Sequence, residues 1–439
     1  MAAQYAISGS TAKGITASVE QAVADGGLAP GAALPPVRRL ADELGVSAGT
    51  VATAYKELRQ RGIVVTRGRG GTVVAQAPAV GSRRPPRAPR GVRDLAGGHP
   101  DSALLPVLRP PARVEPVSGS HRAAPRLAGL EEVAREWFAR DGVPDGRVTF
   151  AHGALDCMAR LLSVELKPGD TVAVEDPGFH HLLDLVPALG LRMAPVAVDD
   201  EGIRPEALRG ALRAGARALV CSPRGQNPMG GRFTAARREA LLAVLTDYPD
   251  VLVVEDDHNA EVAGAAPHSL ATGGLARWAQ VRTVSKHLSV DLRWAALACD
   301  ATTLARHEGR MLLTSGWVSH VLQETVERTM TDPATREVVD RAGRAYTERR
   351  ETLVRELAGH CISARGASGL NVWVPVRDES AVVNGLRSRG WWVAAGARFR
   401  IAAPTAVRIT TSALEPADAV RLAADFSAVL DESEATYGG

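Results

Sequence analysis

Lys286 is the residue whose chemistry says most about this chain. It closely follows the run 281–284, which is rich in β-branched residues. A second run of this kind, 251–254, is followed by Glu255-Asp256-Asp257. Short runs of this kind that end in chargeable residues are typical of buried parallel strands that deliver side chains to a site. The chain has only four lysines: Lys13, Lys56, Lys167 and Lys286. Since the other strongly basic side chains are arginines, a lysine at a strand end indicates chemistry that needs a primary amine, such as a Schiff base.

The ends of the expected strands carry the groups that a pyridoxal phosphate site requires. A lysine must hold the aldehyde of this cofactor, and a carboxylate beside the pyridine nitrogen must keep the ring protonated. Lys286 and Asp256 are our candidates for these two roles. Asn227, in the loop 226–230, can donate to the ring oxygen, and Phe179 can stack on the ring.

The phosphate of the cofactor needs backbone N–H groups at a helix start, hydroxyl groups and an arginine. We expect a helix to open at Gly153-Ala154-Leu155, where main-chain amides can cradle the phosphate. Thr283, Ser285 and Arg293 flank Lys286 with complementary groups. The sequence therefore predicts a complete pyridoxal phosphate site.

Strand-like runs alternate with helical patterns in the body of the chain, from about residue 99 onwards. The runs 172–174, 218–221, 251–254 and 281–284 all end in polar residues. This alternation predicts an α/β fold, in which ligands bind beyond the carboxyl ends of the strands. We expect the site to lie at that edge of the sheet.

The front end, residues 1–75, has the pattern of a winged helix-turn-helix. Ile15, Val19 and Val23 recur at the four-residue spacing of an amphipathic helix, Gly45 breaks the next helix, and Ser47 can cap a third. Two strand-like segments then flank an arginine-rich turn, as in a wing. Residues 1–94 carry 13 Lys plus Arg against 6 Asp plus Glu, a net charge of +7, whereas the whole chain carries +3 and the remainder therefore −4. We expect only this basic front end to meet a polyanion, namely double-stranded DNA.

The DNA contacts that we expect come from the third helix and from arginines. Small hydroxyl residues on this helix can approach base edges and phosphates in a major groove. Arginines on the second helix and at the wing tip can neutralise phosphates. The candidates are Arg38, Ser47, Thr50, Thr53, Arg67 and Arg69.

Residues 76–98 predict an extended linker, because they are rich in proline and arginine and lack apolar periodicity. No apolar run approaches membrane-spanning length, so we expect no membrane segment. Cys157, Cys221, Cys299 and Cys361 are widely scattered, which argues against disulfides and a zinc site and favours a reducing cytoplasm.

Several motifs resemble known families. Leu34-Pro35-Pro36-Val37-Arg38, Leu44-Gly45-Val46-Ser47 and Arg67-Gly68-Arg69-Gly70 resemble the GntR-type winged helix-turn-helix. Residues 99–439 resemble a fold type I aminotransferase domain, through Pro168-Gly169-Asp170, Glu175-Asp176-Pro177-Gly178, Glu255-Asp256-Asp257 and Ser285-Lys286. The whole chain is thus similar to a MocR-type regulator of the GntR superfamily. The resemblance implies a large domain with a mostly parallel sheet and a small α+β domain from about residue 340 to 439.

The same resemblance implies roles for single residues. Lys286 would form the Schiff base, and Arg408, in Val407-Arg408-Ile409-Thr410, would grip the carboxylate of a substrate or effector. His258 stands where the family has a tyrosine that donates to the ring oxygen, and an imidazole there would change charge near neutral pH. Leu155 replaces a polar residue of the phosphate cup. A homodimer is implied, because sites of this fold are usually completed across a dimer interface.

Two functions fit these observations. In the first, the protein is a DNA-binding transcription regulator whose aminotransferase-like domain senses pyridoxal phosphate or an amino compound. In the second, it is an active aminotransferase with a secondary or vestigial DNA-binding domain. The predicted site fits both, whereas a basic wing and a recognition helix are of use only to a regulator, which we therefore favour. The sequence does not choose between the cofactor and an amino acid as effector.

Overall fold

The structure is a computed structural model of the chain, which divides into an N-terminal unit and a body. It describes residues 7–24, 27–29, 31–60, 63–66, 71–75, 88–113, 125–144 and 147–437. Arg67 and Arg69, which we predicted at the wing tip, lie outside the described residues.

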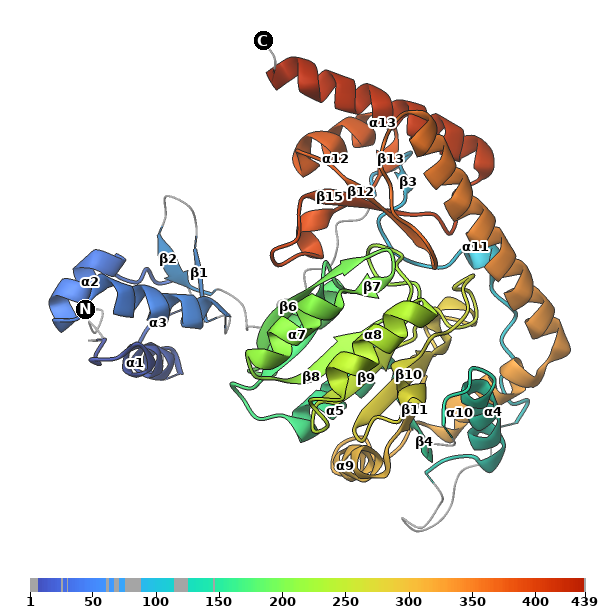
Figure 1. The fold of residues 1–439 in the computed structure, drawn as a ribbon, viewed down its shortest axis with the longest axis horizontal. Helices are drawn as coiled ribbons and strands as arrows, with labels where there is room; N and C mark the ends of the chain where they lie inside the picture. Colours follow the sequence, from blue (N-terminus) through green and yellow to red (C-terminus); the bar gives the residue numbers. More distant parts are fainter. Residues whose placement is uncertain are drawn as a thin grey trace. The chain divides into compact units, whose positions relative to one another are not determined.

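The described residues of the N-terminal unit form three helices and a two-stranded sheet (Figure 1). The elements are α1(Ala12–Ala24), α2(Val37–Leu44), α3(Ala48–Gln60), β1(Val64–Thr66) and β2(Thr72–Val74). The strands pair antiparallel, with Val64 opposite Val74. Gly45 ends α2 with φ of +63°, a conformation that glycine adopts without strain. The helices enclose one apolar core, into which Ile15, Val51 and Leu58 are fully buried. The predicted winged helix-turn-helix is confirmed.

The body is built on an eight-stranded sheet with the order β4-β11-β10-β9-β8-β5-β6-β7. Its strands are β4(Arg147–Ala151), β5(Thr171–Asp176), β6(Arg192–Asp199), β7(Gly202–Ile203), β8(Ala216–Cys221), β9(Leu252–Asp256), β10(Trp278–Thr283) and β11(Ala295–Cys299). Strands β5, β8, β9 and β10 run parallel, and β11 is antiparallel to β10 and β4. Every residue of β9 and β10 is buried, as expected for strands covered on both faces.

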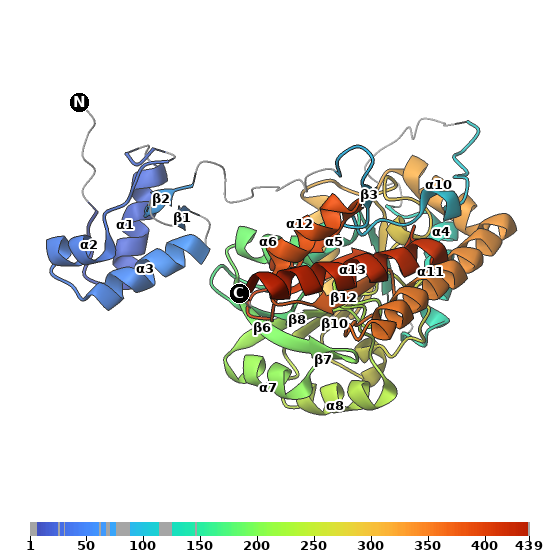
Figure 2. The same ribbon diagram turned by 90° about the horizontal axis from the view of Figure 1, so that it is seen from above.

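Helices cover both faces of this sheet. Figures 1 and 2 show α7(Pro205–Arg213) and α8(Ala235–Leu245) together on one face and α5(Ala154–Glu165) on the other. Leu208 of α7 and Leu241 of α8 are fully buried in a core cluster with residues of the sheet. The remaining helices of the large domain are α4(Ala128–Ala139), α6(His180–Ala188), α9(Ala301–Leu312), α10(His320–Thr331) and the first part of α11(Pro333–Gly359). The predicted α/β class is confirmed.

A small C-terminal domain packs around the end of α11. It contains β12(Asn371–Pro375), α12(Glu379–Ser388), β13(Trp391–Trp392), β14(Ala394–Ala395), β15(Ala406–Thr410) and α13(Pro416–Tyr437). Asp176, at the end of β5 in the large domain, accepts hydrogen bonds from three successive backbone amides of the segment 401–403, at 2.7–2.9 Å. These bonds tie the small domain to the edge of the large sheet where the predicted site lies.

The predicted linker is too long at its C-terminal end. Arg93 and Asp94 form strand β3, which pairs in parallel with β13 of the small domain. Leu95 is buried in the apolar core of the same domain. The composition of this segment resembles a linker, but its strand partner lies about 300 residues further along the chain, so local sequence does not reveal the pairing.

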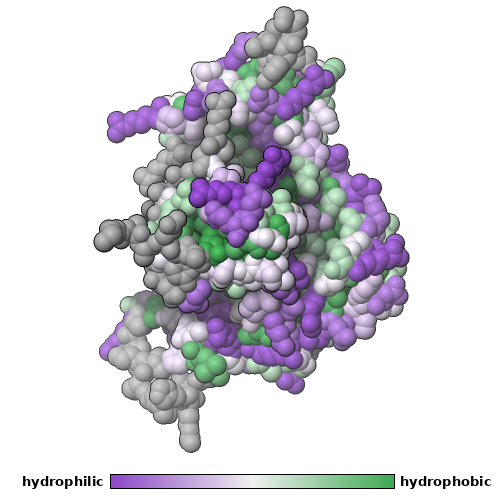
Figure 3. Space-filling view, turned by 90° about the vertical axis from the view of Figure 1, so that its left-hand side faces the viewer, coloured by the Kyte–Doolittle hydropathy of each residue, from purple (hydrophilic) through white to green (hydrophobic). Residues whose placement is uncertain are grey.

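Most large apolar side chains of the described residues are buried, with a few exceptions such as Leu312 and Leu313. On the face shown in Figure 3, hydrophilic residues are interspersed with hydrophobic areas, one of them near the centre of the view. None of the helices in the described ranges is long and apolar enough to cross a membrane.

Candidate cofactor and DNA-binding sites

Residues from the ends of several strands line one cavity of about 370 Å³ in the body. Eleven of the predicted site residues lie in its wall: Ala154, Leu155, Phe179, Asn227, Asp256, His258, Thr283, Ser285, Lys286, Arg293 and Arg408. They come from segments spread over about 250 residues of sequence. The ends of the strands of the large sheet bring most of them to one edge, and Arg408 comes from the small domain. The remaining predicted residue, Gly153, directly precedes Ala154 at the start of α5.

Lys286 ends the short 3₁₀ helix η4(Val284–Lys286), which directly follows β10. Its Nζ donates a hydrogen bond of 2.6 Å to the carbonyl oxygen of Gly98. Burial, together with the positive charge of Arg408, lowers the pKa of Lys286 to about 8. A substantial fraction of this lysine is therefore a neutral amine near physiological pH, which is the form that attacks an aldehyde.

Asp256, at the end of β9, has one carboxylate oxygen that can accept a hydrogen bond from a ligand. Its Oδ2 lies 3.3 Å from Nδ1 of His258, whereas its buried Oδ1 has no hydrogen-bond partner among the described residues. Burial by itself lowers the pKa of His258, but the charge of Asp256 and the hydrogen bond to it outweigh this effect and raise that pKa above its ordinary value. A buried acceptor left without a donor is costly unless a ligand supplies one. A protonated ring nitrogen would meet this need.

The start of α5 and the segment after Lys286 form the other end of the cavity. Gly153 has φ of +93°, a conformation that favours glycine, and a Cβ at this position would lie 3.2 Å from the guanidinium of Arg293. Arg293 itself has φ of +45°, which residues other than glycine rarely adopt. Thr283 Oγ1 lies 2.9 Å from Ser285 Oγ. Backbone amides of a helix start, two hydroxyls and an arginine are thus close together, a donor set that suits a phosphate group.

Arg408 reaches the same cavity from β15 of the small domain. Its Nη1 donates to Asn227 Oδ1 at 2.9 Å, and its guanidinium carbon lies 4.5 Å from the ring centroid of Phe399. Burial, with a contribution from Arg398, lowers its pKa. Its Nε is buried and has no hydrogen-bond partner in the described part of the chain. An anion that entered the cavity would find this guanidinium oriented and incompletely satisfied.

The cavity also contains residues that we did not predict: Gly97, Gly98, His99, His180, His181 and Val290. Gly97 and Gly98 belong to the segment that we assigned to the linker. His180 follows Phe179 at the start of α6, and burial lowers its pKa to about 2, so this imidazole is neutral. In the sequence, the only sign that these two histidines belong to the site was their position directly after Phe179, which we had predicted there.

A buried ion network holds the chain next to Asp256. Asp257 is completely buried, and its two oxygens accept hydrogen bonds from Nε of Arg224 at 2.8 Å and from Nε of Arg282 at 3.0 Å. Both arginines also pair with Asp141. Burial raises the pKa of Asp257, but the two arginines lower it by more, so this carboxylate stays charged. The network fixes the backbone from which Asp256 and His258 extend.

In the N-terminal unit, α3 presents the expected small polar surface. Ser47 caps α3 through a 3.1 Å bond from the amide of Thr50, and the two hydroxyls lie 2.9 Å apart. Thr53 and Arg38 are exposed. Lys56, also exposed on α3 and one turn after Thr53, is a further cation on this helix that we did not single out.

Two family descriptions match the chain. Residues 11–74 match the bacterial regulatory proteins of the gntR family, and residues 126–426 match the aminotransferases of class I and II. The α-aminoadipate aminotransferase LysN from Thermus thermophilus, solved with N-(5'-phosphopyridoxyl)-L-leucine, superposes with a TM-score of 0.68 at 21% identity, over 79% of this chain and 94% of that one. The class defined by fold and matches is a GntR-type DNA-binding domain fused to an aminotransferase domain.

Curated relatives narrow the class to one family. The vitamin B6 salvage pathway transcriptional repressor PtsJ of Salmonella typhimurium is 38% identical over 97% of this chain and 100% of its own length. The probable rhizopine catabolism regulatory protein MocR of Rhizobium meliloti is 30% identical over 52% of each protein. The chain belongs to the MocR-type transcription regulators of the GntR superfamily.

Proposed function

We propose that this regulator binds pyridoxal 5'-phosphate through Lys286 and that its affinity for operator DNA changes when the cofactor is bound. The observation that carries the proposal is the pairing of two groups in one cavity. Lys286 has a depressed pKa, and the nearby Asp256 keeps a buried oxygen without a partner among the described residues. Few ligands other than a protonated pyridine aldehyde need both groups.

The other residues of the cavity have assignable tasks. Asn227 and His258 would contact the ring oxygen, Phe179 would stack on the ring, and the start of α5 with Arg293 would hold the phosphate. Bound pyridoxal phosphate supplies an aldehyde for amines and a ring that withdraws electrons. The protein supplies orientation, exclusion of water and a lysine that is neutral enough to react.

We further propose that pyridoxal phosphate itself is the effector and that the protein represses genes of vitamin B6 supply. The relative of 38% identity that spans nearly the whole chain is named for that role. A ligand shifts DNA affinity only if it binds two states of the protein unequally. Segment 93–99 could transmit the presence of the cofactor to the DNA-binding domain. It continues directly from the expected linker, and the carbonyl of its Gly98 accepts the hydrogen bond from Lys286.

A footprint on the DNA upstream of the protein's own gene tests these proposals. It compares the protein without cofactor, with pyridoxal phosphate, and as Lys286→Ala. We expect a cofactor-dependent change of protection that Lys286→Ala loses and that the exposed Lys167→Ala keeps. Protection that ignores the cofactor would contradict the effector assignment and favour an amino compound. Absence of protection, together with turnover of amino donors, would support the aminotransferase alternative.

The protein is proposed to act as a homodimer through a face formed by the end of α9 and the start of α10. Leu312 and Leu313 are 66% and 82% exposed, and Trp317 and Val321 are each 38% exposed. Large apolar side chains gathered on a surface in this way indicate an interaction site. Two DNA-binding domains per dimer would then meet two half-sites on the operator.

A further inference from the structure

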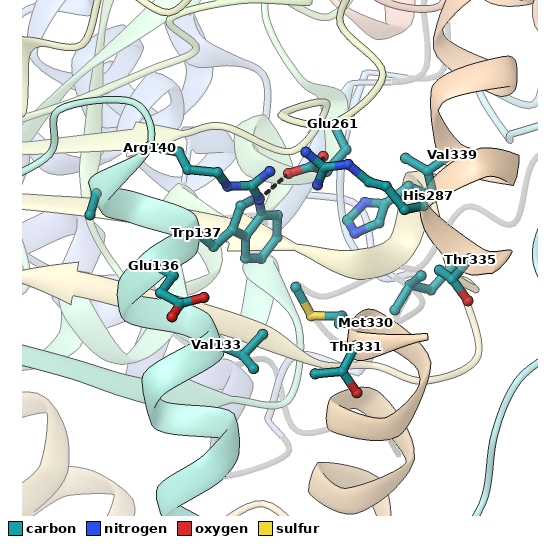
Figure 4. Close-up of a pocket in the computed structure, with 13 residues that line it drawn as sticks. Val133, Glu136, Trp137, Arg140, Glu261, His287, Met330, Thr331, Thr335 and Val339 are labelled. Atoms are coloured by element: carbon teal, nitrogen blue, oxygen red, sulfur yellow. Dashed lines mark hydrogen bonds and ion pairs between the residues drawn. The ribbon is translucent and has the colours of Figure 1, made fainter. Parts of the chain in front are cut away.

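His287, the residue after Lys286, lines a second cavity that is separate from the lysine cavity (Figure 4). Its volume is about 640 Å³. The wall is formed by α4, the end of α10, the start of α11 and the segments around Glu261 and His287. None of these residues has a task in the proposed cofactor site. The size lies within the range of pockets that take drug-sized ligands.

Two aromatic residues in the wall carry buried nitrogen atoms that are not fully satisfied. His287 is 4% exposed and Trp137 is 2% exposed, and their rings meet edge to face with centroids 5.5 Å apart. Nε2 of His287 has no hydrogen-bond partner within the described ranges. Burial raises the pKa of Glu261, but His287, Arg140, Arg336 and the nearby indole of Trp137 together lower it. Nε1 of Trp137 makes no hydrogen bond of normal geometry to any described residue. Burial lowers the pKa of His287 to about 4, so its ring is neutral and Nε2 can either donate or accept, whereas Nε1 of Trp137 can only donate. Buried polar groups are normally satisfied, so the pair points to a ligand with polar atoms, at least one of them an acceptor.

Two arginines at the wall add further donors. Arg140, directly after α4, and Arg336 on α11 approach the same carboxylate, that of Glu261, at 2.9 Å and 3.8 Å. The dashed line in Figure 4 marks the closer pair. Arg336 also lies 3.7 Å from Asp340. Each guanidinium has five N–H donors, and these carboxylates do not occupy them all. The donors that remain suit a carboxylate, sulfonate or phosphate group, with Glu136 as the one other acidic side chain in the wall.

The rest of the wall is apolar. Val133, Leu288, Met330 and Val339 belong to it, and Leu288 and Val339 are almost completely buried. An aromatic or branched aliphatic body would bury apolar surface there. The arginine and indole donors favour an anionic group, and the apolar side chains favour an apolar body. Together they favour an organic anion with an apolar body.

The cavity shares its backbone with the cofactor site at two places. Lys286 and His287 are joined by one peptide bond at the end of η4, where the amide of His287 bonds to the carbonyl of Val284. Glu261 lies three residues after His258, in a turn closed by bonds such as that from the amide of Val262 to the carbonyl of Asn259, at 2.8 Å. A ligand that moved His287 or Glu261 would therefore move residues of the cofactor site.

We propose that this cavity is a second small-molecule site, which takes an organic anion with an aromatic or branched apolar body and acts on Lys286 through His287. The site does not depend on the proposed effector role of pyridoxal phosphate. Binding can be measured without DNA, so failure of one proposal leaves the other standing.

The test uses 8-anilinonaphthalene-1-sulfonate as an aromatic anion and N-phenyl-1-naphthylamine, the same body without the sulfonate, as a neutral control. Both are measured by equilibrium dialysis against the full chain saturated with pyridoxal phosphate, which keeps the first cavity filled. We expect one anion per chain and an affinity about tenfold or more above that of the neutral compound, because the arginines meet the sulfonate. No binding, or equal affinity for both compounds, would overturn the proposal.

Three variants locate the anion. Val133→Trp fills the cavity from α4 and should weaken binding by about tenfold or more. Arg140→Met removes a cation but keeps an apolar stem and should also weaken binding, while Arg135→Met on the same helix, outside the cavity, should not. Unchanged affinity in both Val133→Trp and Arg140→Met would place the dye elsewhere and overturn the site.

The action on Lys286 has its own readout, the visible absorbance of bound pyridoxal phosphate. We expect the anion to shift this absorbance in the wild type and in Arg135→Met, but not in Val133→Trp. Binding in the cavity without a spectral change would leave the site in place and overturn its coupling to the lysine.

Discussion

His258 lies 3.3 Å from one oxygen of Asp256 and leaves the other oxygen without a partner among the described residues. The imidazole thus holds the carboxylate from one side, and the carboxylate in turn raises the pKa of His258 despite the burial of the ring. The remaining oxygen is available to a ligand in the cavity. This relationship makes His258, which stands where the family resemblance implies a tyrosine, a support for Asp256.

Replacement of Asp256 should weaken cofactor binding without loss of the fold. We expect Asp256→Ala to lower the affinity for pyridoxal phosphate by about 10- to 100-fold, the equivalent of one charge-assisted hydrogen bond. Spectroscopic titration of the apoprotein measures the effect, with the exposed Asp250→Ala as control. Wild-type affinity in Asp256→Ala would show that the carboxylate does not face the ring nitrogen.

The rate of cofactor capture should rise with pH through about 8, because Lys286 reacts as the neutral amine and its pKa is about 8. About a tenth of this lysine is neutral at pH 7 and about nine tenths at pH 9, whereas an ordinary lysine is almost fully protonated at both. Arg408→Met removes a positive charge from its surroundings and should move the midpoint to higher pH. Stopped-flow absorbance follows the capture. A midpoint above pH 10 in the wild type would contradict the burial of the lysine.

Loss of Asp257 should strongly destabilise the body. Asp257→Asn leaves Arg224 and Arg282 buried with only Asp141 to balance them, and disruption of a buried ion pair costs about 3–5 kcal/mol. The pKa of Asp257 is lowered in the fold, so its contribution is present above the unfolded pKa of a carboxyl group and is lost as pH falls through the folded value. Urea unfolding measures the change, and the exposed Asp250→Asn serves as control. A cost below about 1 kcal/mol would show that the arginines find other partners.

Arg38→Ala should weaken binding to all DNA sequences alike and lower the slope of log affinity against log salt by about one, because a phosphate contact releases one counterion. Fluorescence anisotropy on cognate and random duplexes measures both quantities. Arg147→Ala makes the same charge change in the body and should have no effect. A loss confined to the cognate duplex would show that Arg38 contacts a base.

Leu313→Arg should convert the proposed dimer to a monomer, since it places a charge among large apolar side chains of the contact face. Light scattering after gel filtration measures the mass, and Val420→Arg, at another exposed apolar residue, should leave it unchanged. A dimer that persists in Leu313→Arg would place the interface elsewhere.

Much of the architecture was predictable from local sequence. The run 251–254 is continuous and apolar because its strand is buried on both faces, and the mostly β-branched run 281–284 belongs to the next buried strand. Each run is followed by the polar residues that line the cavity. Gly45 and Ser47 likewise mark the helix boundaries of the N-terminal unit, since turn and cap chemistry depends on neighbours a few residues away. The scarcity of lysine made Lys286 conspicuous without any structure.

The sequence by itself thus determined the fold class, the two kinds of domain and eleven of the residues that meet in the cavity of Lys286. Only the tertiary structure decided that residues 93–99 belong to the body, because β3 finds its partner in β13. It alone placed His180 and His181 in the cofactor cavity and His287 with Trp137 around a second cavity. Cavities and buried unpaired atoms depend on packing between segments distant in the chain, and no periodicity or motif encodes that packing locally.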